Sequence, residues 1–203
     1  MAHFTVRFDS QTGALSGLTQ KRGGRAHADA NHLLAWLRYQ TFSAEDYERF
    51  FHQYIRPEEQ GNGWSREDFT KPGLEIARPI SRLWQPQAVR LYRRGSQVMV
   101  HLQGPAAAVR DYGCPREFFL TYTFAGHAPE IAVELQWFDK PACRLPEALW
   151  LSFAPRVAAA ADWRMDKLGQ PVSPLEVVEN GSRHLHAVGR GVTCTDGAAL
   201  LCI

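Results

Sequence analysis

The sequence lacks the features that would place it in a membrane or a secretory pathway. Its 203 residues contain no run that approaches the ~18–20 apolar residues of a membrane span. The N-terminus, MAHFTVRFDS, has neither the basic start nor the apolar stretch of a signal peptide. We therefore expect a cytoplasmic protein that does not enter the membrane.

Cysteine is scarce, and the four cysteines form no C-x-x-C pair. The patterns of a zinc ribbon and of a thioredoxin-type redox motif are therefore absent. In a cytoplasmic protein such cysteines are expected to be buried free thiols.

Neither the charge nor the common sequence motifs point to a reaction. Lysine and arginine total 23 against 21 aspartate and glutamate, a formal net charge of +2. We therefore expect neither nucleic acid nor an anionic membrane surface as a partner. The sequence also contains no P-loop, no Rossmann glycine fingerprint, no G-x-S-x-G elbow and no H-E-x-x-H helix. These absences argue against the commonest nucleotide-binding proteins, hydrolases and metalloproteases.

What the sequence does contain is period-two alternation of apolar and polar residues, which is typical of half-buried strands. The strands follow one another with little helix between them, so the pattern favours an antiparallel β sandwich over βαβ units. No repeat or linker-like segment divides the chain, and we expect one domain over residues 1–203. The predicted strands are 4–8, 14–18, 36–42, 87–94, 97–103, 117–125, 130–138, 148–155, 162–164, 184–189 and 197–203.

One short amphipathic helix is predicted at about 44–55. Ser43 is the expected N-cap, and Asp46 three residues later completes a capping box. Aromatic residues then recur at spacings of three and four, which predicts packing of this helix against a sheet. The polar, glycine-containing segment 56–73 is predicted to be a long loop.

The six tryptophans divide into core and exposed candidates. Those predicted to lie in the core are Trp36, Trp137 and Trp150. Trp84 ends a strand. Trp64 and Trp163 are surrounded by polar residues, where an indole ring can stack on a sugar.

Two histidine-containing stretches could supply metal ligands. In NGSRHLHAVGRGV (180–192), a strand would direct His184 and His186 to the same face. In HADANH (27–32), histidine and aspartate lie two apart. Spacing indicates no further ligand for either stretch, so a solvated strand edge and a polar loop are the favoured interpretations. Several carboxylates beside predicted strands are compatible with a glycosidase acid/base pair, namely Asp139, Glu147, Asp162, Asp166 and Glu176.

Several stretches, in order along the chain, resemble a known family. RFDSQTGALSGLTQKRGGRAHAD (7–29) resembles the hairpin D-x-x-T-G-x-(I/L)-x-S-L-x-D-K-x-x-G-R, which opens the C-terminal β region of family 38 glycoside hydrolases, the α-mannosidases. Residues 38–55, 145–155 and 162–192 resemble an uncharacterised bacterial branch of that family. The likeness spans nearly the whole chain.

The resemblance implies a galactose-mutarotase-like β supersandwich. In that family, zinc and the nucleophilic aspartate belong to an N-terminal α/β catalytic domain that nothing here matches. It therefore implies no cofactor in this chain, zinc only in a missing catalytic domain, and no zinc role for His27 or Asp29. It also implies further strands after 197–203. We therefore expect a chain that is truncated there, or an exposed sheet edge near 198–203 that a partner chain or self-association covers.

The function implied is that of an accessory β domain in a family 38-like carbohydrate-active protein, without catalytic activity alone. Its carbohydrate contacts are predicted at Asn180, Arg183, His184, His186 and Trp163.

Two alternatives remain open. A stand-alone mutarotase or epimerase would need a histidine and a carboxylate on opposite sides of a sugar ring. The candidates for that pair are His101, His184 or His186 with Glu134 or Glu176. The other alternative is a structural or interaction β domain.

Overall fold

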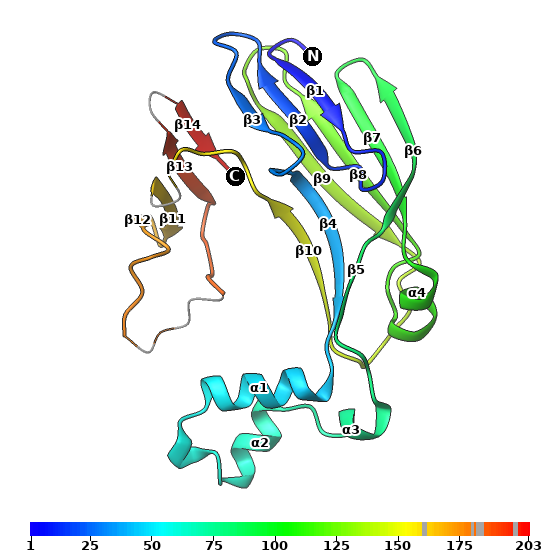
Figure 1. Ribbon diagram of the computed structural model, residues 1–203, viewed down its shortest axis with the longest axis vertical. Helices are drawn as coiled ribbons and strands as arrows, with labels where there is room; N and C mark the ends of the chain where they lie inside the picture. The colour runs from blue at the N-terminus through cyan, green and yellow to red at the C-terminus, as the bar shows by residue number, and fades with distance from the viewer. Residues whose placement is uncertain (160–161, 180, 182–184, 197–198) are drawn as a thin grey trace.

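The computed structural model describes residues 1–159, 162–179, 181, 185–196 and 199–203. The chain is mainly β, with antiparallel sheets and few helices (Figure 1). None of its described helices is long and apolar enough to span a bilayer. The predicted all-antiparallel architecture is confirmed at this level.

Three sheets make up the β structure. Sheet I contains, in spatial order, β1 (Phe4–Phe8), β2 (Leu15–Gln20), β4 (Leu34–Thr41) and β10 (Glu147–Phe153), with β3 (Ala26–Ala28) on β2 and β5 (Arg82–Trp84) on β4. Sheet II contains β6 (Gln87–Arg94), β7 (Gln97–Gln103), β8 (Glu117–Phe124) and β9 (Ile131–Phe138). Sheet III contains β12 (Gln170–Val172), β11 (Trp163–Lys167), β13 (Val192–Asp196) and β14 (Ala199–Cys202).

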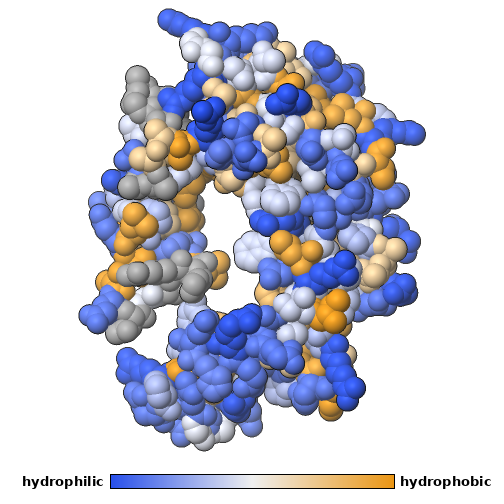
Figure 2. All heavy atoms as spheres, viewed as in Figure 1, coloured by the Kyte–Doolittle hydropathy of each residue, from blue (hydrophilic) through white to orange (hydrophobic). Residues whose placement is uncertain are grey.

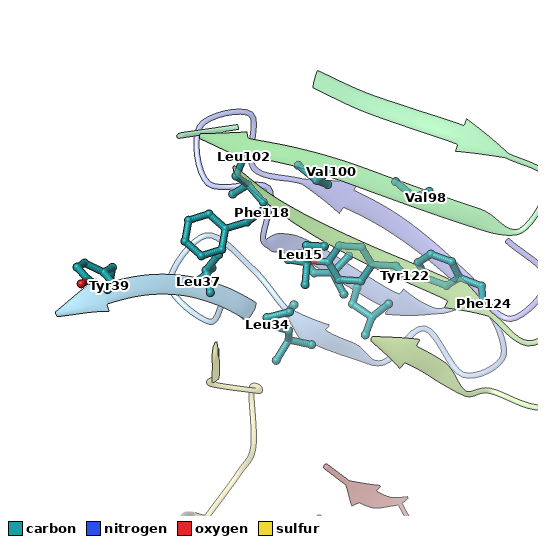
Figure 3. Packing of buried hydrophobic residues seen from close by; sticks show 14 of the residues in the cluster. Leu15, Leu34, Leu37, Tyr39, Val98, Val100, Leu102, Phe118, Tyr122 and Phe124 are labelled. Carbon is teal, nitrogen blue, oxygen red and sulfur yellow. The ribbon is translucent and has the colours of Figure 1, made fainter. Parts of the chain in front are cut away.

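Sheets I and II face each other across the main hydrophobic core. Figure 3 shows Leu15 and Leu37 of sheet I directed at the apolar side chains of sheet II. The alternation explains this arrangement, because every second residue of β7 is buried while the residues between them are half-buried. The buried β7 residues are Val98, Val100 and Leu102.

The β1–β2 hairpin depends on Asp9 and Gly13. The Asp9 carboxylate accepts hydrogen bonds from the backbone N–H of Gln11 and Thr12 and from the Thr12 hydroxyl. These bonds, with the hydroxyl contributing most, lower the pKa of Asp9. Gly13 has φ +69°, and a Cβ there would lie 2.6 Å from Cγ1 of Val100. The turn therefore needs glycine both for its backbone angle and for its contact with sheet II.

The predicted helix is confirmed as α1 (Ala44–Tyr54), including its capping box. The Ser43 side chain accepts from the Asp46 N–H, and the Asp46 carboxylate accepts from the Ser43 N–H.

The predicted packing of this helix against a sheet is wrong. Phe51 is the buried residue of α1, and it lies outside the core cluster between sheets I and II. Its ring lies under the guanidinium of Arg66, 4.6 Å away, on α2 (Gly63–Phe69). Helices α1 and α2 lie together at one end of the molecule, whose surface is mostly hydrophilic (Figures 1 and 2). Helical periodicity predicts that an apolar face will be buried, and it does not specify the partner.

The prediction of a long loop over 56–73 is also wrong. This segment contains η1 (Pro57–Glu59) and α2, and α3 (Leu74–Ala77) follows it. The Ser65 hydroxyl donates to the carbonyl oxygens of Glu59 and Asn62, which joins η1 to α2. Elements of three to seven residues are too short to show a reliable 3.6-residue period. The same limitation applies to α4 (Ala106–Tyr112), which the sequence reading missed.

Most strand predictions agree with the structure to within a few residues, and 184–189 is the exception. Its described residues, 185–189, form no strand. The Lys167 ammonium donates to the Ala187 carbonyl, and the Gly189 N–H donates to the Asp166 carbonyl. The backbone of 185–189 is therefore held by these hydrogen bonds, and not by the regular hydrogen bonding of a β-sheet.

The strand β14 ends the order of sheet III, so the expected sheet edge is present among the described strands. A partner at that edge remains a prediction.

The importance of the two-sheet core can be tested with two leucines. Leu37 on β4 is 0% exposed, whereas Leu91 on β6 is 48% exposed. We expect Leu37→Ala to lower the free energy of unfolding by about 2–5 kcal/mol, because it leaves a cavity. Leu91→Ala should cost about 1 kcal/mol or less. Urea unfolding followed by circular dichroism measures both, and equal losses would contradict the assignment of this core.

Candidate functional site

A group of aromatic and polar side chains lies on the outer side of sheet I. Because side chains alternate along a strand, the β4 residues Trp36, Arg38 and Gln40, which alternate with the buried Leu37 and Tyr39, point away from sheet II. The antiparallel register places Arg38 opposite Trp150, and Trp36 opposite Ser152. We name this group the tryptophan face. Its members are Trp36, Arg38, Gln40, Trp150 and Ser152.

Contacts across the two strands hold the polar groups of the tryptophan face in place. Nη2 of Arg38 donates to the Ser152 hydroxyl at 2.8 Å, and the Arg38 guanidinium lies 4.3 Å from the centre of the Trp36 ring. Nε1 of Trp150 donates to the amide oxygen of Gln40 at 2.8 Å. Arg38 and Ser152, and likewise Trp150 and Gln40, are diagonal neighbours on one face of an antiparallel pair, where long side chains reach one another.

Trp36 is also fixed from the segment that follows β5. Its Nε1 donates to the amide oxygen of Gln85 at 2.5 Å. Gln85 in turn donates to the backbone carbonyl oxygens of Leu37 and Pro86, at 3.2 and 2.8 Å. The ring of Trp36 is therefore held by a side chain that is itself anchored to backbone.

The tryptophan face is open to solvent. Trp150 is 41% exposed, and Trp36 and Arg38 are half-buried. In Figure 2 the molecule has an opening between its C-terminal part and its main body, and β4 and β10 run along this opening in Figure 1. The exposed part of the Trp150 ring is accessible to a ligand.

The chemistry of the tryptophan face suits binding. A tryptophan ring offers a flat apolar surface for the C–H side of a pyranose ring, and nearby amide, hydroxyl and guanidinium groups can bond its hydroxyls. None of the five side chains is a carboxylate or an imidazole, the groups that most often act as general acids and bases. The arrangement therefore provides recognition and no acid/base pair of its own.

Behind the face, on the core side of the same strands, Glu147 is committed to structural bonds. The Tyr39 hydroxyl bonds the Glu147 carboxylate and the Tyr112 carbonyl oxygen, and the Lys140 ammonium donates to the other Glu147 oxygen. Burial, with the Glu147 bond adding to it, raises the pKa of Tyr39 well above its ordinary value. Tyr39 therefore stays protonated, and Glu147 joins β4 to β10 instead of facing the ligand side.

The structure places only part of the predicted sugar site. Asn180, Arg183 and His184 lie outside the described residues. His186 is half-buried in a segment without a strand. Trp163 on β11 is half-buried, and its role in sugar binding remains a prediction.

Trp163 lies on the buried side of sheet III. It pairs with Cys194, which is fully buried, and shares its side of the strand with Met165. A hollow of about 430 Å³ on the same sheet is lined by Arg164, Met165, Asp166 and Arg190, among others, and Trp163 is not part of its lining.

The HADANH stretch begins in β3, and its residues Asp29 to His32 form a small turn. Asp29 accepts hydrogen bonds from Nδ1 of His32 at 2.8 Å and from the Asn31 N–H, and these bonds lower its pKa. Burial, and the charge of Arg25, lower the pKa of His27. Within the described ranges, no three His, Cys, Asp or Glu side chains lie together in a way that could hold a metal ion. These residues do not fit a zinc site, and we derive no chemistry from one.

The prediction that Trp36, Trp137 and Trp150 lie in the core is wrong for Trp137 and Trp150, and Trp36 is only half-buried. Trp137 and Trp150 are 48% and 41% exposed. Trp84, in contrast, is buried, and its Nε1 donates to the Thr41 hydroxyl. The missed signal was the phase of the alternation. In WLRYQ, Trp36 is in phase with Arg38 and Gln40 and out of phase with the buried residues.

The burial of Cys114, whose thiol lies near Glu147 behind the tryptophan face, can be tested. Burial raises the pKa of the Cys114 thiol to about 12, and the nearby charge of Glu147 adds to the effect. A raised pKa keeps the thiol protonated at pH 8, so it should not react with iodoacetamide in the folded protein. In urea the pKa returns to about 8.5 and labelling should follow. Peptide mass spectrometry measures this, and labelling of Cys114 at equal rates in both conditions would contradict its burial.

Comparisons with known proteins give one family match. The family model described as a domain of unknown function, DUF5054, matches residues 1–132, a stretch that includes β4 and ends before β10. No curated protein matches the chain, and no solved structure matches it either. The matched stretch is well over half of the 203 residues, and the chain belongs to the DUF5054 family.

Proposed function

We propose that the chain is an accessory β domain of a glycoside hydrolase family 38-like carbohydrate-active protein, and that its tryptophan face binds carbohydrate. The observation that supports this most directly is the pairing of Trp36 and Trp150 with Arg38, Gln40 and Ser152 on an exposed sheet face. Aromatic platforms with a few fixed polar groups are suited to sugar rings, because they offer both apolar area and hydrogen bonds.

The proposal includes the fold that the resemblance implies, a galactose-mutarotase-like β supersandwich. Two antiparallel sheets packed face to face, with a third antiparallel sheet beyond them, are compatible with it (Figures 1 and 3). The N-terminal hairpin that carries the resemblance is formed as β1 and β2. We place the protein in the cytoplasm as part of the same proposal.

In this proposal the domain binds carbohydrate and does not catalyse a reaction by itself. Its face presents an arginine, an amide, a hydroxyl and two indoles, whereas Glu147 on the same strands is held by Tyr39 and Lys140 on the other side. In this proposal the chain orients a carbohydrate, and acid/base or zinc chemistry belongs to another domain.

The test is affinity gel electrophoresis of the full chain in mannan, xylan, polygalacturonate and alginate. We expect at least one polysaccharide to retard the protein. Trp150→Ala should weaken that binding by about tenfold or more, because loss of a stacking contact of ~1.4 kcal/mol corresponds to a factor of ten. Trp64→Ala is the matched control, since Trp64 is 52% exposed on α2, away from the face.

Three results would contradict the proposal. The first is retardation by no polysaccharide, and the second is retardation that Trp150→Ala leaves unchanged. The third is turnover of a nitrophenyl α-mannoside by the purified chain, which would contradict the absence of catalysis.

A further inference from the structure

We infer that the tryptophan face selects sugars that bear a carboxylate, such as uronic acids, and that Arg38 is the residue that recognises this group. The inference rests on the proposed carbohydrate binding and names the class of carbohydrate. It follows from the charge, the geometry and the neighbours of Arg38.

Arg38 brings a full positive charge to the tryptophan face, and no carboxylate neutralises it among the described ion pairs. The acidic residue at the end of the neighbouring strand, Glu147, is bonded to Lys140 and Tyr39 on the core side. The other four members of the face are uncharged. A ligand with a negative charge would therefore neutralise the positive charge of Arg38 on this surface.

The guanidinium is held in a fixed orientation with donors to spare. One side of its plane is stacked on Trp36, 4.3 Å from the ring centre, and Nη2 is bonded to Ser152. Nε of Arg38 is buried and has no hydrogen-bond partner within the described part of the chain, so the donors left for a ligand are those of Nη1 and the second N–H of Nη2. A planar guanidinium fixed by stacking is well suited to bind a carboxylate through two parallel hydrogen bonds, since little side-chain freedom remains to be lost.

The position of Trp150 connects this donor group to a sugar ring. Trp150 lies directly opposite Arg38 in the antiparallel pair, and such neighbours have Cβ atoms about 4.5–5.5 Å apart. A pyranose ring stacked on Trp150 would bring its exocyclic group within reach of Arg38. In a uronic acid that group is a carboxylate, and in a neutral hexose it is a hydroxymethyl group.

The experiment is isothermal titration of the full chain with oligogalacturonate and with the same oligosaccharide after reduction of its carboxylates to alcohols. We expect the oligogalacturonate to bind about tenfold more tightly at low salt, because charge-assisted hydrogen bonds are stronger than neutral ones. The difference should shrink as NaCl is added, since salt screens a partly exposed ion pair.

Variants of Arg38 test whether this residue causes the preference for oligogalacturonate. Arg38→Gln should remove the advantage of oligogalacturonate and leave the affinity for the reduced oligosaccharide within about twofold of the original. Arg38→Lys keeps the charge without the planar fork, so it should retain part of the preference. The matched control is Arg82→Gln, because the Arg82 guanidinium also lies 4.3 Å from a tryptophan ring, that of Trp84. Arg82 pairs with Thr41 and is in phase with the buried Tyr39, so it is not part of the tryptophan face. Circular dichroism of each variant confirms folding.

The possible outcomes separate the inference from the proposed function. Equal binding of both oligosaccharides, or equal weakening of both by Arg38→Gln, overturns the selectivity while carbohydrate binding stands. If the chain binds neither these oligosaccharides nor any polysaccharide of the gel panel, the proposed function itself fails.

Discussion

The tryptophan face exists because one side of β4 is packed in the core between sheets I and II. Leu37 and Tyr39 pack in that core, so Trp36, Arg38 and Gln40, which alternate with them, must point outward. A slip of one residue in the pairing of β4 with β10 would bury Arg38 and expose Leu37, at a large cost in desolvation and lost burial. The hydrophobic core therefore fixes the register, and the register places Arg38 beside Trp150.

The same constraint makes the face rigid. Its side chains project from the middle of two paired strands, and cross-strand bonds join Arg38 to Ser152 and Trp150 to Gln40. Behind it, Glu147 bonds Tyr39 and so ties the two strands together from the core side. A surface built on paired strands loses little conformational freedom when a ligand binds, which favours affinity.

Much of the β structure could be predicted from the sequence, because alternation reports directly on half-buried strands. The α1 capping box was also predictable, since its two residues are adjacent in the chain. The predicted burial fails for Trp137 and Trp150, because the general tendency of large aromatic residues to be buried does not decide a single position. For Trp36 the alternation of WLRYQ already indicates the outer face, since Trp36 is in phase with Arg38 and Gln40. The partner of α1 and the bonds that replace a strand over 185–189 depend on contacts between distant segments, which one sequence does not specify.

The central claim is that a carbohydrate occupies the tryptophan face. Fluorine NMR of the chain labelled with 5-fluorotryptophan tests it most directly, because each of the six tryptophans gives its own signal, assigned by substitution. On titration with oligogalacturonate, the signals of Trp36 and Trp150 should shift, while those of Trp64 and Trp137 stay in place. Shifts confined to Trp64, Trp137 or Trp163, or none at saturating ligand, would contradict the account.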